Sequence, residues 1–125
     1  MSEFKTDFVN EEQIDFEIEG RKFSYIPVTA GDENDWLPKY TYIEDGKIKQ
    51  DLSILNKYKI AGKLVKVPYD KEDIKEIIGV DKEWNELDLE QKWKLLRKIK
   101  PNLFDKIVSK INEINTGANN IKKKD

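Results

Sequence analysis

The sequence predicts a small α+β domain, in which an N-terminal β-hairpin is followed by a helical C-terminal half. Three observations support this class: apolar and acidic residues alternate over residues 14–19, turn dipeptides follow at residues 20–21 and 45–46, and apolar residues recur at helical spacing from residue 52 onward. With 125 residues the chain has the length of one domain. We divide it into a mobile acidic arm (1–12), one α+β domain (13–116) and a disordered Lys-rich tail (117–125).

The first hairpin is predicted over residues 14–20 and 21–27. Ile14, Phe16 and Ile18 alternate with acids, which places them on one face of a half-buried strand. Gly20, followed by Arg21, provides the turn because glycine tolerates positive φ. The second strand should end at Pro27 or lie at a sheet edge, since proline has no N–H to donate.

A short helix and a second hairpin are expected next. Thr29 and Asp32 have the spacing of a capping box, and the helix that they begin should run to Leu37, where Pro38 stops it. Residues 40–43 favour a strand, Asp45-Gly46 is a type I′ turn pair and residues 47–50 can return as the partner strand. We therefore expect a small exposed hairpin near residues 40–50.

The next segment should be helical from an N-cap at Asp51, burying Leu52, Leu55 and Leu64 on one face. A further helix is expected to begin after Asp70 and to end at Gly79, which suits a left-handed C-cap.

Another turn should begin at Asp81 and carry Trp84, and Asp88 should cap a helix that Pro101 ends. Pro101 should also start the last helix, which should end at Gly117 and form an antiparallel pair with the helix before it. Its apolar stripe comprises Leu103, Phe104, Ile107, Val108, Ile111 and Ile114. A partner-binding helix could carry such a stripe, but so short a domain needs its best apolar face for its core.

Composition excludes much of enzyme chemistry. The chain has no Cys and no His, so it has no thiolate nucleophile and no imidazole base or metal ligand. A carboxylate enzyme with Mg²⁺ is the third alternative, but the acids near Glu83 and Glu86 stand at expected helix N-termini, where they complement the helix dipole. We predict that the protein is not an enzyme and has no catalytic, cofactor-binding or metal-binding residues.

Charge is unevenly distributed along a chain whose net charge is −2. Residues 1–19 hold seven acids and one base, whereas Lys122, Lys123 and Lys124 stand near the end. No basic stripe forms, which disfavours nucleic-acid binding, although a small regulator using the last helices and the Lys tail is the alternative. No apolar run is long enough for a membrane span and no signal peptide is evident, so we expect no membrane partner and a cytoplasmic location. The abundance of Lys, Glu and Ile is thermophile-like, and an AT-rich genome would produce the same bias.

Three aromatic residues are not accounted for by the expected core. Trp36, Tyr40 and Tyr42 lie near the second hairpin, and aromatic side chains dominate many protein interfaces. We therefore take them as the candidate partner-binding residues.

Several short motifs carry a resemblance to a known family. They are Phe16, Ile18, Gly20, Arg21 and Phe23 in the hairpin; Pro27, Val28, Thr29, Ala30 and Gly31 at the helix start; and Trp84, Leu87, Leu95, Leu96, Lys100, Pro101, Leu103, Phe104, Lys106 and Ile107 near the end. With these motifs the chain resembles small tail-region proteins of tailed bacteriophages and proviruses, particularly tail assembly chaperones.

The resemblance implies a non-catalytic protein of provirus origin, acting in the cytoplasm of the host cell. It implies that the chain binds the tape-measure protein and tail-tube subunits during assembly and is absent from the finished particle. The family has no defined partner-binding motif, so no residue role is transferred. An uncharacterised provirus structural protein is a second alternative, and the oligomeric state stays open, a homo-oligomer included.

Overall fold

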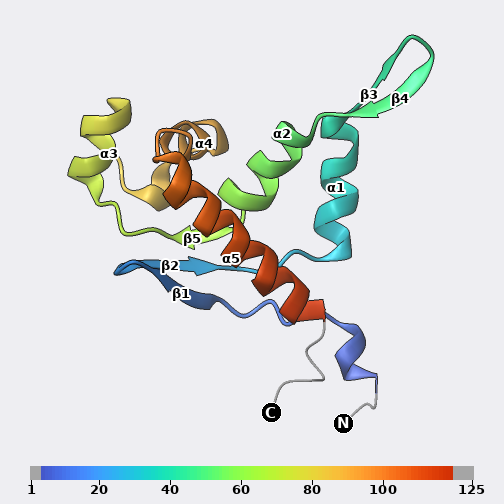
Figure 1. Cartoon of the computed structure of the whole chain (residues 1–125), viewed down its shortest axis with the longest axis horizontal. Helices are drawn as coiled ribbons and strands as arrows, with labels where there is room; N and C mark the ends of the chain where they lie inside the picture. Colours follow the sequence, from blue (N-terminus) through green and yellow to red (C-terminus); the bar gives the residue numbers. More distant parts are fainter. Residues whose placement is uncertain (1–3, 120–125) are drawn as a thin grey trace.

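The computed structural model describes residues 4–119 and has an α+β fold, with most of its helices in the C-terminal half (Figure 1). Strands and helices occur in chain order as η1 (Lys5–Asp7), β1 (Ile14–Ile18), β2 (Arg21–Tyr25), α1 (Ala30–Tyr40), β3 (Thr41–Glu44), β4 (Lys47–Gln50), α2 (Leu52–Asn56), η2 (Lys57–Ala61), β5 (Leu64–Lys66), α3 (Lys71–Ile78), η3 (Trp84–Glu86), α4 (Leu89–Leu96) and α5 (Pro101–Asn119). Among them, η1 and η3 are 3₁₀ helices and η2 is a π-helical turn.

The first hairpin confirms the alternation read in the sequence. Strands β1, β2 and β5 form an antiparallel sheet in that order, and the rings of Phe16 and Phe23 stack across β1 and β2 at 5.2 Å between centroids. The predicted turn is wrong by one residue, because Glu19 and Gly20, not Gly20 and Arg21, adopt positive φ. The pairing of Ile18 with Arg21 leaves these two residues as the loop.

Helix α1 begins as predicted but continues past its proline. Asp32 donates its N–H to Thr29 Oγ1 at 3.1 Å and the Thr29 N–H donates to Asp32 Oδ2 at 3.0 Å, which completes the capping box. The predicted end at Leu37 is wrong, since Pro38 lies inside the helix. Pro38 stands in the last turn, so its missing N–H costs one hydrogen bond close to where the helix ends anyway.

A π-helical turn changes which residues of the next segment are buried. Asp51 caps α2 as expected, but Leu52 is 61% exposed and Leu55 is only half-buried. Leu64 is buried as predicted but lies in β5 and not in the helix, and Ile60 and Ala61 are buried in its place. The π turn holds more residues per turn than an α-helix, which rotates the buried face away from Leu52.

Gly62 ends this turn at a position where only glycine fits. A Cβ atom there would lie 2.4 Å from the backbone oxygen of Tyr58. The close approach lets the chain leave the π turn directly into β5, whose Leu64 pairs with Tyr25 of the sheet.

After β5, helix α3 is capped as predicted, whereas the turn that carries Trp84 starts two residues later than predicted. Asp70 completes a capping box at the start of α3, and Gly79 ends that helix with φ of 73°. The turn carrying Trp84 begins at Glu83 and not at Asp81, because the Glu86 carboxylate reaches back to accept the Glu83 N–H at 2.8 Å.

The last two helices are not the predicted antiparallel pair. Helix α4 packs against η2 and α3, whereas α5 crosses the sheet beside β1 (Figure 1). The two meet where Trp93 lies 6.1 Å from Phe104, between ring centroids. Helix α4 ends at Leu96, before Pro101, and α5 continues through Gly117, so the predicted C-cap is wrong.

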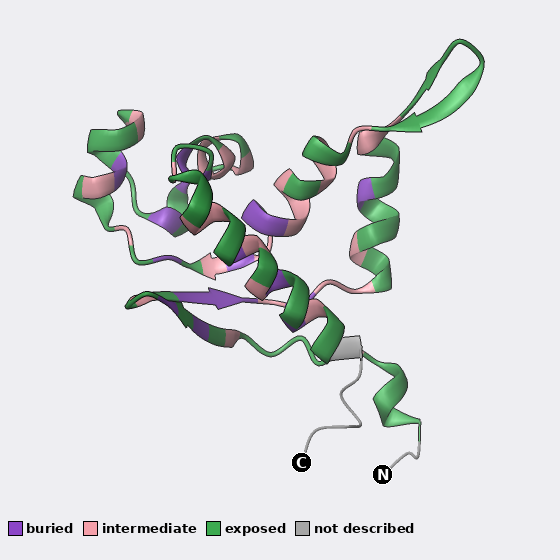
Figure 2. Cartoon of the chain, in the orientation of Figure 1, coloured by how far each residue is buried: buried purple, intermediate pink, exposed green. Residues whose placement is uncertain are grey.

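The core lies between the sheet, η2, α3, α4 and α5 (Figure 2). As predicted, the stripe of α5 contributes to it: Ile107, Ile111 and Ile114 are buried, and Leu103, Phe104 and Val108 pack against it. Part of the N-terminal arm forms η1, while Lys122, Lys123 and Lys124 lie outside the described residues. Along residues 4–119, no helix combines the length and apolarity that crossing a bilayer requires.

Candidate protein-interaction surfaces

The hairpin of β3 and β4 projects from the body of the molecule (Figures 1 and 2). All of its residues are exposed except Thr41, which is half-buried at the base. Eight large hydrophobic residues are exposed in the part of the chain that the structure describes, and five of them lie between residues 37 and 52. They are Leu37, Tyr42, Ile43, Ile48 and Leu52. The exposed apolar surface is therefore concentrated on this hairpin and at its base.

Local turn chemistry sets the register of this hairpin. Asp45 and Gly46 have φ of 53° and 74°, as a type I′ turn requires, and this two-residue loop pairs Glu44 with Lys47. At the base, the Asp51 N–H donates to the Tyr40 carbonyl oxygen at 2.7 Å. The hairpin is thus the one that the Asp45-Gly46 pair predicted.

The two faces of the hairpin differ in chemistry. Ile43 pairs with Ile48, and they are 75% and 76% exposed on one face. The other face carries Tyr42 and Lys49 as one pair and Glu44 and Lys47 as the next, with a Lys49 to Glu44 ion pair at 2.7 Å. The isoleucine face has no neighbouring sheet or helix in the described chain to cover it.

The three predicted partner-binding residues do not form one exposed patch. Trp36 is only 9% exposed and stacks on Tyr58, with 6.0 Å between ring centroids, so its ring offers little surface to a partner. Tyr40 is half-buried at the end of α1, and Tyr42 is 45% exposed on the charged face.

Ile43 and Ile48 were not predicted as binding candidates. The signal was available, because a two-residue loop at Asp45-Gly46 makes these two isoleucines cross-strand partners on one face.

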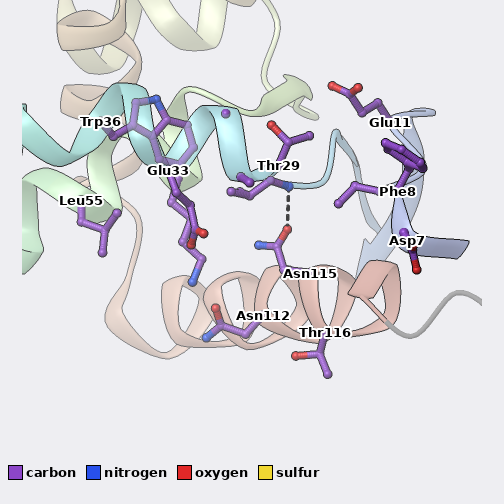
Figure 3. Close-up of a pocket in the computed structure, with 15 residues that line it drawn as sticks. Asp7, Phe8, Glu11, Thr29, Glu33, Trp36, Leu55, Asn112, Asn115 and Thr116 are labelled. Carbon is purple, nitrogen blue, oxygen red and sulfur yellow. Dashed lines mark hydrogen bonds between the residues drawn. The ribbon is translucent and has the colours of Figure 1, made fainter. Parts of the chain in front are cut away.

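A cleft lies between the N-terminal segment, α1 and α5 (Figure 3). This cleft has a volume of about 890 Å³, and its walls include Phe8, Trp36 and Asn115. Asn115 accepts the Val28 N–H at 2.9 Å, drawn dashed in Figure 3, and its amide donates to the Tyr25 hydroxyl at 3.2 Å. Because both ends of the Asn115 amide are used, this residue ties α5 to the chain between β2 and α1.

Tyr25 continues this network into η2. Its hydroxyl donates to the carbonyl oxygen of Lys59 at 2.6 Å, and burial raises the pKa of Tyr25 to about 12. Nearby, burial alone would raise the pKa of the Asp32 carboxyl, but hydrogen bonds from Lys63 and Thr29 hold it below its usual range. The hydrogen bonds of Asn115, Tyr25 and Asp32 beside the cleft therefore serve the packing of the fold.

These contacts predict an alkaline loss of stability. The pKa of Tyr25 rises from its ordinary 10 to about 12 in the folded state, so stability is complete below pH 10 and falls as the pH rises toward 12. The free energy of unfolding from urea titrations should be about 1.4 kcal/mol lower at pH 11 than at pH 8 through this residue alone. In Tyr25→Phe this component should vanish, although the variant loses about 1 kcal/mol at neutral pH. An equal alkaline loss in both proteins would contradict the assignment.

The acids once considered for a metal act as helix caps. Glu83 and Glu86 cap η3, and Asp88 accepts the Gln91 N–H at 2.8 Å to cap α4. In residues 4–119 no group of three or more acids is arranged to hold a metal ion.

Comparison with models of known families, with curated proteins and with solved structures finds no match to this chain.

Proposed function

We propose that the chain is a non-catalytic protein-interaction module of provirus origin that acts as a tail assembly chaperone, binding tape-measure and tail-tube proteins. Two kinds of evidence support the proposal. The motifs in residues 16–31 and 84–107 resemble this class of protein. The projecting hairpin adds a physical means of binding, since it concentrates exposed apolar side chains on a segment that contributes nothing to the core.

The exposed pair Ile43 and Ile48 carries the proposal. A two-stranded hairpin is marginally stable by itself in water, and its isoleucine face is uncovered. Burying one isoleucine contributes about 1.5–3 kcal/mol, so covering the pair would add about 3 kcal/mol or more to a complex. An assembly chaperone needs such a surface and no reactive group.

The test begins with the genes beside the one that encodes this chain. A tail-tube gene upstream and a very long tape-measure reading frame downstream are the expected arrangement. The tagged chain should then co-purify with the tape-measure or tail-tube protein when they are co-expressed.

A double variant, Ile43→Asp with Ile48→Asp, should reduce the recovered partner at least tenfold, since each change places a charge in the buried contact. Ser109→Asp adds the same charge at an exposed position of α5 and should leave recovery unchanged. If the chain binds neither protein, the proposal fails.

A further inference from the structure

Within residues 4–119 the hairpin is a two-stranded sheet of its own, so the outer edges of β3 and β4 are both unpaired. The register shows which backbone N–H and C=O groups face outward. Hydrogen-bonded and non-hydrogen-bonded pairs alternate along an antiparallel ladder. Asp51 donates its N–H to the Tyr40 carbonyl oxygen, so Tyr40 and Asp51 are a hydrogen-bonded pair. By alternation, the pair Tyr42 and Lys49 and the pair Glu44 and Lys47 are hydrogen-bonded, whereas Ile43 and Ile48 form a non-hydrogen-bonded pair. The N–H and C=O groups of Ile43 therefore point out from the free edge of β3, and those of Ile48 from the free edge of β4.

The β3 edge is complementary to itself. If two copies of β3 pair antiparallel about Ile43, this residue meets Ile43 of the second copy, and Tyr42 meets Glu44 on each side. Neither pair sets like charges opposite each other. The two-fold axis also places the two protein bodies at opposite ends of the sheet.

Two other pairings are disfavoured. Pairing β4 with β4 about Ile48 sets Lys47 opposite Lys49 twice, and like charges directly opposite are destabilising. Pairing β3 with β4 of a second copy sets opposite charges beside each other. It also stacks the copies in the same orientation, with successive molecules only two strand spacings, about 9.6 Å, apart. A domain of this length is roughly 30 Å across, so successive bodies would overlap.

We propose that two copies of this chain pair through β3, antiparallel about Ile43, and so form a four-stranded sheet. Its order is β4, β3, β3 and β4, and one face carries a row of four isoleucines, Ile48 and Ile43 from each copy. The shared edge is only four residues long, so the dimer is weak and depends on concentration. The dimer does not rest on the proposed function, because the purified chain alone tests it.

Single cysteines give a direct test, since the chain has none of its own. In the proposed dimer the Cα atoms at position 43 are about 5.5 Å apart, within the range that a disulfide bridges. Those at position 48 are three strands apart, about 14 Å, which is too far. Under mild oxidation Ile43→Cys should therefore form a linked dimer at least ten times faster than Ile48→Cys, which has almost the same exposure.

Proline variants give a second test that needs no oxidation. Ile43→Pro removes an N–H from the free β3 edge and Ile48→Pro removes one from the free β4 edge, and neither takes a hydrogen bond from the hairpin itself. By light scattering, the wild-type chain and Ile48→Pro should rise from 14.7 kDa toward twice that mass as concentration increases, whereas Ile43→Pro should stay monomeric.

The opposite results overturn the proposal. Equal or faster linkage of Ile48→Cys would indicate pairing through β4 or through the isoleucine faces. A wild-type chain that stays monomeric at every concentration, with no preference for linkage at position 43, would show that this edge does not join copies. If the wild-type chain is monomeric and Ile43→Pro no longer binds the tape-measure protein, the β3 edge pairs with a strand of that partner instead.

Discussion

Ile111→Asp is expected to unfold the domain. Ile111 is fully buried in the α5 stripe and belongs to the core cluster that α5 shares with the sheet. An unpaired carboxylate there costs more than about 4 kcal/mol, a large part of the 5–15 kcal/mol that typically stabilises a domain. Thermal unfolding followed by circular dichroism should show no cooperative transition for this variant.

The matched control makes the same chemical change at an exposed residue. Ile43→Asp, in strand β3 of the projecting hairpin, should shift the free energy of unfolding by no more than about 0.5 kcal/mol. Ser109→Asp, on the exposed side of α5, separates the effect of burial from that of adding a charge to this helix. A cooperative transition near the wild-type temperature in Ile111→Asp would show that α5 is not part of the core.

Trp84→Ala is expected to cost about 3–5 kcal/mol of unfolding free energy, because it empties the volume of the largest type of side chain. Trp84 is buried in η3, its indole N–H donates to the Leu64 carbonyl oxygen at 3.0 Å, and the Lys92 ammonium lies 5.2 Å from its ring centroid. It therefore joins η3 to the sheet strand β5. Urea titration at neutral pH should give this loss.

Two further variants divide that loss into its parts. Trp84→Phe leaves the Leu64 carbonyl oxygen without its donor but keeps an aromatic ring in the core. Its loss of unfolding free energy should therefore be smaller than that of Trp84→Ala, by at least about 1 kcal/mol. Asn85→Ala, the exposed neighbour in the same turn, should change stability by no more than about 0.5 kcal/mol. If Trp84→Ala were as mild as Asn85→Ala, η3 would not be anchored through the indole.

Predictions from local chemistry were mostly confirmed. Thr29, Asp51, Asp70 and Asp88 cap the four helices that the sequence assigned to them. Each cap depends on a side chain and backbone groups no more than three residues away, so a short stretch of sequence holds the whole interaction. The Asp45-Gly46 hairpin was predictable for the same reason.

Predictions of burial over longer distances fared differently. Trp36 was named a partner-binding candidate because the expected core did not account for it, but it is buried against Tyr58, which is 22 residues further along the chain and is placed there by α2 and η2. The predicted buried face of α2 was wrong at Leu52, because the spacing of the apolar residues does not show the π turn that follows. Ile43 and Ile48, not Trp36, are therefore the apolar side chains that are open to a partner.

The sequence by itself determined the α+β class, the first hairpin, the projecting hairpin, the four helix caps and the core stripe of α5. These features depend on residue type and on spacing within one turn or one strand pair, where the competing interactions are few. Only the tertiary structure decided which aromatic residues are covered, how α4 and α5 are placed and which apolar residues remain outside. Burial depends on how segments far apart in the chain pack together, and packing can override local propensity and single stop signals such as Pro38 and Gly117.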